Sequence, residues 1–413
     1  MNQNNNSVSQ SLSFSDTSTN PCVYIGMCGS CQLGHMTYEE QLRHKTSSHI
    51  ENFREFYDRE FEIFSSTPVA FRARAEFKLY HNDGKVKYAM VDKDKSYLCV
   101  DKCLIVNEQI QTIMPKLLVS INNSEILLQR VFMVEFMTSE DEILVTLVYH
   151  KKLENDWIEE AKKLQEILNI KLIGRSRGQK IVLSDDFITN KLKIDNSCAS
   201  ALSSRKFNII QKEGAFSQPN RYMNTQMVSW VLDNVTNSGD LCELYCGGGN
   251  FTLPLSTKFD KVLATEISKT SIASAKESCK LNDIDNIEFI RMSSEEFTSA
   301  LKGEREFNRL KDVDLSKYSF SKLYPLPSTT YPLPHINYHI STIFVDPPRS
   351  GLDNGTVELV SKFDTIIYIS CSPDTLYRDI KVLSKTHNVI KFAFFDQFVW
   401  SEHIESGAIL TKK

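Results

Sequence analysis

The sequence has no apolar run long enough to cross a bilayer, which takes about 20 residues as a helix. Its first segment, residues 1–20, is a mixture of Ser, Asn, Gln and Thr without a basic start or an apolar stretch. That composition predicts a disordered tail rather than a signal peptide. We therefore expect a cytoplasmic protein with no membrane partner, and nothing in the sequence indicates an obligate protein partner.

A net positive charge is also missing, since the 413 residues carry a formal charge of -4. This argues mildly against a nucleic-acid partner, although binding of RNA needs only a local basic surface. A solvated strand face explains each basic group equally well. The candidates are Arg72, Arg74 and Lys78, then Lys151 and Lys152, then Arg175, Arg177 and Lys180.

Cysteine is present ten times, and in a cytoplasmic protein these thiols are expected to be reduced. Clusters of them then indicate metal ligands or catalysts rather than disulfides. Seven cysteines are scattered, whereas Cys22, Cys28 and Cys31 fall within ten residues.

The length predicts two domains with smaller pieces attached. Residues 21–67 hold the cysteine motif and an amphipathic helix expected over 36–64. Residues 68–214 alternate strands, helices and turns, with a hairpin at Asn82-Asp-Gly84. We interpret 68–214 as a mixed α/β RNA-binding domain.

From residue 215 to 413, strands alternate with helices, which predicts a doubly wound, mostly parallel sheet. The proline- and tyrosine-rich stretch from 318 to 339 reads as a surface insertion. The expected strands are 241–245, 261–266, 287–292, 342–346 and 365–370, and a helix is expected over 223–234.

The first of these strands leads into a glycine loop at Gly247-Gly-Gly249, and the next ends at Glu266, nineteen positions after Gly247. A carboxylate there is placed to hold the hydroxyls of a ribose. The loop has neither the full Gly-x-Gly-x-x-Gly spacing nor a phosphate-binding lysine. The combination therefore favours an adenosyl ligand over a nicotinamide dinucleotide.

Two later strands end in Asp346 and Cys371, at the edge where ligands of such sheets bind. A cysteine after an apolar strand is usually a small core residue. A thiol at this rim has a use, however, because its addition to C6 of uracil makes C5 nucleophilic toward a methyl sulfonium. A base must then remove the C5 proton; Glu405 is the best candidate, and Glu402 is the alternative.

Taken together, these motifs make the chain resemble the tRNA (uracil-5-)-methyltransferase family over residues 38–413. The resemblance implies a Rossmann-like class I methyltransferase domain. The segments that carry it occur in the same order and at similar spacing. They are 71–77, 148–153, 216–220, 243–247, 305–310, the Asp346 and Cys371 segments, and 394–398.

The resemblance implies an enzyme that methylates C5 of an RNA uridine with S-adenosyl-L-methionine through a cysteine–C6 adduct. The expected target is uridine 54 in the T-loop of tRNA. The implied nucleophile and base are Cys371 and Glu405, and Arg349 is expected to contact RNA. The residues expected around the methyl donor and the target base are Gln218, Tyr245, Asn250, Glu266 and Asp346.

The cysteine motif departs from the tRNA enzymes and is similar to the iron–sulfur motif of related 23S rRNA uracil-5-methyltransferases. It implies a 4Fe-4S cluster held by Cys22, Cys28, Cys31 and Cys103, with Cys99 as the alternative fourth ligand. Zinc and a relic without metal are the competing interpretations. The ribosomal enzymes usually carry an N-terminal barrel, for which residues 1–20 are too few. The resemblance over residues 38–413 therefore favours tRNA as the substrate, and the cysteine motif leaves rRNA as an open alternative.

Two other functions are competing interpretations of these motifs. Cytosine-5 RNA methylation uses similar thiol chemistry but is expected to show its cysteine in other sequence surroundings. A tRNA-folding, RNA-binding module is a non-enzymatic alternative, and it is compatible with methylation because the target base must be flipped out first.

Overall fold

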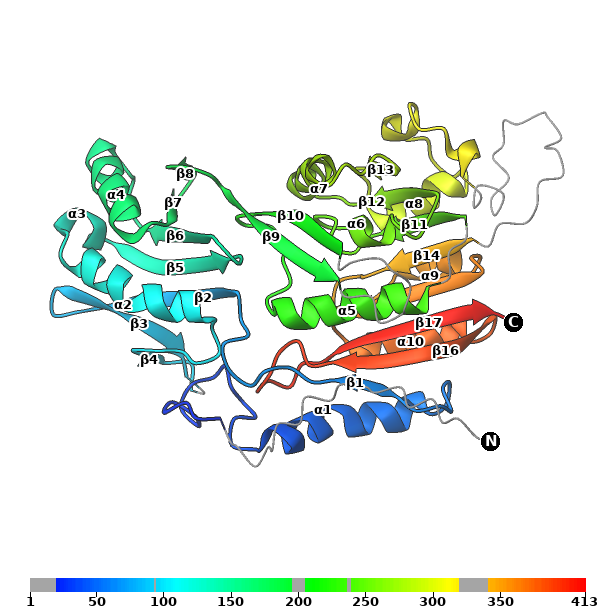
Figure 1. The fold of residues 1–413 in the computed structure, drawn as a ribbon, viewed down its shortest axis with the longest axis horizontal. Coiled ribbons are helices and arrows are strands. Elements are labelled where there is room, and N and C mark those ends of the chain that lie inside the picture. The colour runs from blue at the N-terminus through cyan, green and yellow to red at the C-terminus, as the bar shows by residue number, and fades with distance from the viewer. Residues whose placement is uncertain (1–19, 93, 195–204, 236–238, 319–340) are drawn as a thin grey trace, which may run out of the picture.

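A computed structural model describes residues 20–92, 94–194, 205–235, 239–318 and 341–413. The predicted N-terminal tail, apart from Asn20, and all but the first residue of the predicted insertion over 318–339 lie outside the described residues. Two sheets stand at opposite ends of the molecule, and a two-stranded ribbon lies between them (Figure 1). Among the described helices, none combines the length and apolar character that a membrane span requires.

The larger sheet has eight strands in the order β1-β16-β17-β15-β14-β11-β12-β13. Every pairing is parallel except the two made by β17, so β17 alone runs against the others. This confirms the predicted class I methyltransferase fold with a mostly parallel sheet. The strands are β1 (Glu62–Phe64), β11 (Asp240–Leu244), β12 (Lys261–Thr265), β13 (Ile287–Ile290), β14 (Thr342–Val345), β15 (Thr365–Ser370), β16 (His387–Phe395) and β17 (Glu405–Lys412).

Helices cover both faces of this sheet, because its central strands are buried on both sides. Alternate strand residues divide between two cores: Cys242 and Ile366 belong to one, and Leu241 and Ile367 to the other. The first core is covered by α1 (Tyr38–Phe53), α8 (Ser294–Leu301), α9 (Asn354–Val360) and α10 (Pro373–Leu383). The second is covered by α5 (Arg221–Asn234), α6 (Thr252–Leu255) and α7 (Lys269–Leu281). Short 3-10 turns follow at Asn308–Leu310 and Leu315–Lys317.

The smaller sheet has seven strands in the order β4-β3-β2-β5-β6-β7-β8. The predicted hairpin is confirmed: Asp83 and Gly84 take φ values of 48° and 72°, as a two-residue turn of this kind requires. The strands are β2 (Arg74–Asn82), β3 (Lys85–Val91), β4 (Tyr97–Cys99), β5 (Val131–Thr138), β6 (Ile143–Tyr149), β7 (Lys171–Ser176) and β8 (Gln179–Val182). Its helices are α2 (Glu108–Asn122), α3 (Glu125–Leu128) and α4 (Asn155–Leu168).

Strands β9 (Phe187–Ile194) and β10 (Arg205–Lys212) form the ribbon that joins the two halves. The backbone N–H of Ile210 donates to Ser278 Oγ on α7 at 2.9 Å, and Phe207 and Leu192 pack into the core under α5 and α7. The ribbon therefore belongs physically to the methyltransferase core, although it precedes the expected boundary at residue 215. That boundary stays a prediction.

The single helix expected over residues 36–64 is wrong at its C-terminal end. Helix α1 begins after the capping residue Thr37 and ends at Phe53, and residues 62–64 form β1 at the edge of the large sheet. Phe61 and Phe64 stack on rings of β16, so pairing with a distant strand overrides the local helical pattern.

Candidate active site

The predicted site residues meet at one edge of the large sheet. Tyr245, Glu266, Asp346 and Cys371 each come directly after a parallel strand, namely β11, β12, β14 and β15. The carboxyl ends of these strands share one edge, where open α/β sheets bind their ligands. Glu405 joins them from the opposite direction, because the reversed strand β17 begins there.

The glycine loop and Glu266 form one structure. The carboxylate of Glu266 accepts the N–H of Gly247 at 3.1 Å and the N–H of Ser268, the N-cap of α7, at 2.7 Å. Tyr245 adopts a left-handed φ of 62°, and a Cβ on Gly249 would lie 2.5 Å from Leu253. The loop is therefore fixed by its own chain, with Glu266 at the strand end where a ribose hydroxyl pair would be held.

Three of the polar residues expected near the methyl donor, Gln218, Tyr245 and Asn250, have a buried side-chain partner that the sequence did not reveal. The side chains of Asn250 and Asn224 exchange two hydrogen bonds, at 2.8 and 2.7 Å. Gln397 Nε2 donates to Gln218 Oε1 at 2.6 Å, and the Tyr245 hydroxyl lies 2.5 Å from Ser294 Oγ. These partners lie far away in sequence, so only the fold brings them together.

Cys371 and Glu405 face each other across two antiparallel strands. The register pairs Ser370 of β15 with Ser406 of β17, so one further step sets Cys371 opposite Glu405. Cys371 also opens onto a cavity of about 250 Å³. The cavity is lined by His49, Arg349, Cys371, Ser372, Pro373, Asp374, Glu402, His403 and Ile404. The structure therefore brings the predicted thiol, carboxylate and arginine together.

Burial dominates the electrostatics of this rim. It raises the pKa of Glu405 to about 8, with a further increase from the charge of Asp346, and it raises the pKa of Asp346 to about 7. The pKa of Cys371 is raised to about 11 by burial, then by Glu405 and Asp346, while the cation of Arg349 lowers it. A carboxyl with a pKa near neutrality beside a thiol suits proton transfer.

The alternative base, Glu402, is in a different environment. Its side chain is 54% exposed at the mouth of the cavity and lies 3.0 Å from His44 Nε2. Glu405 is buried, and its charge is the largest single electrostatic contribution to the raised pKa of Cys371 after burial. The geometry therefore favours Glu405 over Glu402 as the proton acceptor.

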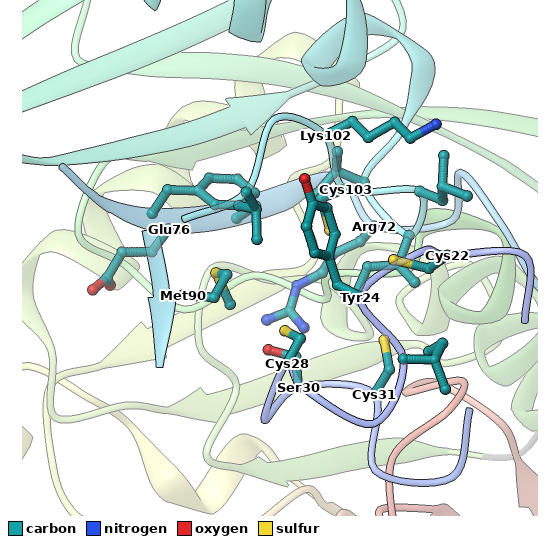
Figure 2. Close-up of a pocket in the computed structure, with 17 residues that line it drawn as sticks. Cys22, Tyr24, Cys28, Ser30, Cys31, Arg72, Glu76, Met90, Lys102 and Cys103 are labelled. Carbon is teal, nitrogen blue, oxygen red and sulfur yellow. The ribbon is translucent and has the colours of Figure 1, made fainter. Parts of the chain in front are cut away.

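A second group of thiols surrounds a cavity of about 140 Å³ between the N-terminal loop and the small sheet. Cys22, Cys28, Cys31 and Cys103 all line it (Figure 2), whereas Cys99 lies on β4 and pairs with Ala89. Within the described part of the chain, no three His, Cys, Asp or Glu side chains are gathered as ligands of a single metal ion. The expected fourth cysteine is thus at the cavity.

Arg72 supplies a cation to the same cavity (Figure 2). Its backbone N–H donates to Ile105 O at 2.8 Å and its carbonyl accepts from Asn107 N at 2.9 Å, which holds the Cys103 segment against it. Burial lowers the pKa of Arg72, and nearby Cys103 and Cys31 oppose that shift. The four thiols therefore share their cavity with a half-buried arginine.

The basic groups proposed from the sequence lie in different environments. Arg72 lines the cysteine cavity, and Arg175 and Lys180 both pair with Glu213. Sequence reasoning missed a different feature on the small sheet: the rings of Phe132 and His150 stack 3.7 Å apart at an angle of 9°. They line a cavity of about 310 Å³ with Lys78, Leu79, Tyr80, His81 and Tyr97. The alternation of aromatic and basic residues along these strands was the available signal.

The profile of the tRNA (uracil-5-)-methyltransferase family matches residues 37–330 and 333–413. This chain belongs to that family. It is 48% identical over 398 residues to a tRNA/tmRNA (uracil-C(5))-methyltransferase of Aliarcobacter butzleri, covering 95% of this chain and 99% of the relative. It is 47% identical over 397 residues to a protein of the same name from Sulfurovum sp., covering 95% and 100%. The family predicted from the sequence is thereby confirmed.

Among solved structures, the fold is similar to that of the Pyrococcus abyssi tRNA (uracil-54, C5)-methyltransferase in complex with S-adenosyl-L-homocysteine. The TM-score is 0.67 over 94% of this chain and 86% of that one, at 18% sequence identity. This similarity supports the fold of the uracil-5-methyltransferase family across both halves of the chain.

Proposed function

We propose that the protein transfers a methyl group from S-adenosyl-L-methionine to C5 of uridine 54 in the T-loop of tRNA. The observation that carries this proposal is the placement of Cys371 opposite Glu405, at the edge that also carries the glycine loop and Glu266. Membership of the tRNA (uracil-5-)-methyltransferase family and relatives named for tRNA and tmRNA support the substrate class.

In the proposed reaction, Cys371 first gives its proton to solvent in the cavity, and the resulting thiolate sulfur adds to C6 of the uracil. The C5–C6 double-bond electrons move toward the O4 carbonyl, which gives C5 carbanion character. Carbon 5 then takes the methyl group, and the donor's sulfonium carbon–sulfur bond breaks to leave a neutral thioether. Glu405 accepts the proton from C5, and expulsion of the Cys371 thiolate restores the double bond.

We assign the remaining site residues to binding. Glu266 holds the ribose hydroxyls of the donor, and Tyr245 and Asn250 border the adenosyl group. Gln218 and Asp346 lie between the donor and the target base. Arg349, exposed beside Cys371, lowers the pKa of that thiol and contacts the RNA backbone. The fixed partners of these side chains support the assignment, because preorganised groups lose little entropy on binding.

The stacked pair Phe132 and His150 supports contact with an unpaired base of the RNA. Sequence-specific RNA recognition places splayed bases on aromatic faces, and stacking contributes about 1–3 kcal/mol per base. Lys78 lies 5.7 Å from the centroid of the Phe132 ring, which adds a cation beside the same surface. We propose this aromatic pocket as an RNA contact of the small sheet.

Substitution Phe132→Ala tests that contact. We expect KM for tRNA to rise about tenfold with kcat little changed, because stacking is lost in binding rather than in chemistry. Ile167→Ala, at an exposed apolar position of α4 away from the pocket, is the matched control. Equal KM values for the two variants would remove the pocket from the RNA interface.

The function is tested by methyl transfer to unmodified tRNA and to 23S rRNA transcripts side by side, with the modified nucleoside identified and mapped. Methylation of the T-loop uridine alone is the expected result. Methylation of the rRNA alone would replace tRNA by the substrate that the N-terminal cysteine motif predicts. Transfer to neither RNA would overturn the enzymatic assignment in favour of an RNA-binding module.

We also propose that Cys22, Cys28, Cys31 and Cys103 bind a 4Fe-4S cluster. Four thiols on one cavity, and a half-buried arginine to balance their negative charge, support this donor set. When bound, such a cluster would tie three thiols of the N-terminal loop to Cys103, which follows β4 of the small sheet. No step of methyl transfer is assigned to it.

A further inference from the structure

Gln397 and Gln218 form a pair of buried side-chain amides. Gln397 follows β16 by two residues and is completely buried, while Gln218 is 9% exposed. Gln397 Nε2 donates to Gln218 Oε1 at 2.6 Å. Among the described residues, Gln397 Oε1 has no hydrogen-bond partner.

The direction of this hydrogen bond determines what Gln218 presents to a ligand. Its carbonyl oxygen is turned toward Gln397 and accepts from it, so the opposite group, the amide nitrogen with two N–H donors, is the one turned away from Gln397, and it can only donate. Reversing both amides would instead leave the buried NH₂ of Gln397 without an acceptor. Buried donors without a partner are rarer than under-satisfied carbonyls, so the observed direction is preferred.

The position of Gln397 is itself rigid. The neighbouring carboxylate of Asp396 accepts hydrogen bonds from Tyr38, Gln41 and Lys45 at 2.8, 3.1 and 2.7 Å. Lys45 and Asp396 are both fully buried, which anchors the end of β16 to α1. Gln397 therefore holds Gln218 from a fixed point of the fold rather than from a loop that can adapt.

We propose that Gln397 is a positioning residue that keeps Gln218 oriented as a hydrogen-bond donor to the bound ligand. The inference rests on the proposed function, in which Gln218 borders the methyl donor and the target base. The group recognised is a hydrogen-bond acceptor. It is either the carboxylate of the donor's methionine portion or a carbonyl of the uracil.

The test combines Gln397→Met, Gln218→Met and the double variant, with full-length protein. Affinity for S-adenosyl-L-homocysteine is measured by calorimetry, and kcat and KM are measured with tRNA. We expect each single variant to lower the affinity for one of these two ligands about tenfold. The double variant should be no worse than Gln218→Met alone, because the two residues act as one unit. Weaker binding of S-adenosyl-L-homocysteine would identify the donor's carboxylate as the group that Gln218 recognises. A raised KM for tRNA would identify a carbonyl of the uracil instead.

Gln41→Met is the matched control, since Gln41 is equally buried and contacts Asp396 but not Gln218. It should lower the melting temperature without the tenfold loss of ligand affinity.

If Gln397→Met does not fold, Gln397→Glu keeps the side-chain shape. When ionised, this side chain cannot donate a hydrogen bond, so the variant should show the same loss of ligand affinity. Additive single effects, or normal binding by the folded Gln397 variants while Gln218→Met is impaired, would overturn the inference. If Gln218→Met itself has no effect in an active enzyme, the assigned role of Gln218 fails instead.

Discussion

Two groups of thiols in the described part of the molecule have neighbours of opposite charge: carboxyls lie beside Cys371, and an arginine lies beside the N-terminal cysteines. At the sheet edge, the pKa of the single Cys371 thiol is raised by its burial and by two carboxyls, Glu405 and Asp346, and is lowered by Arg349. In the N-terminal cavity, four thiols and the half-buried side chain of Arg72 line the same space. The charged neighbours thus differ between the thiol that we propose as a nucleophile and the thiols that we propose as cluster ligands.

The two sites are also physically connected. Cys31 packs in one small core with Phe71 and Trp400, and Leu33 N donates to Trp400 O at 2.9 Å. Trp400 lies five residues before Glu405 in the sequence. The cysteine loop therefore braces the segment that carries the base, although it contributes no group to the chemistry we propose.

The largest expected effect is at the catalytic thiol. Cys371→Ser should lower methyl transfer at least about a thousandfold, because a hydroxyl is a far weaker nucleophile toward C6. Binding of tRNA should be retained, since the oxygen occupies the same position. Single-turnover methylation and a filter-binding assay measure the two properties. Near-normal turnover would rule out the covalent mechanism.

A smaller loss is expected for the base. Glu405→Gln should reduce turnover about a hundredfold and let a covalent protein–RNA adduct accumulate, because C5 keeps its proton. The adduct is detected by denaturing gel electrophoresis with labelled tRNA. Glu402→Gln is the matched control and should form no such adduct.

The pH dependence of kcat/KM sharpens the same assignment. The pKa of Glu405 is raised to about 8, so its basic form is depleted below that pH. The rate should therefore rise with pH over about 6 to 9 through ionisation of Glu405, and continue to rise at higher pH through ionisation of the Cys371 thiol, whose pKa is raised to about 11. Glu405→Gln should remove the lower-pH part of this rise and keep the part due to the thiol, and an unchanged profile in that variant would assign the lower titration to another group.

The smallest effect on turnover is expected in the cysteine cavity. Cys28→Ser should leave kcat within about twofold, since Cys28 lies outside the sheet edge. It should nevertheless lose iron and sulfide relative to native protein purified without oxygen, and melt at a lower temperature. Iron, sulfide and visible absorbance are the measurements. Colourless native protein without iron would dismiss the cluster while leaving the methyltransferase assignment intact.

Much of the site was predictable because it depends on strand ends. A residue placed after an apolar strand of a parallel sheet must lie at the ligand-binding edge, which is how Glu266, Asp346 and Cys371 could be grouped. The hairpin at Asp83 and Gly84 follows from turn chemistry in the same way. Strand β1 could not be found, since three residues carry too little periodicity and their partner β16 is more than three hundred positions away.

By itself, the sequence determined the family, the alternation of strands and helices, and the chemical character of each strand end, since all of these depend on local pattern. Only the tertiary structure decided which groups meet. It set Cys371 opposite Glu405 through the register of a reversed strand, paired Gln218 with Gln397, and brought Cys103 and Arg72 to the N-terminal cysteines. The physical reason is that charge, burial and hydrogen bonding act through space, between residues whose separation along the chain carries no information about their distance.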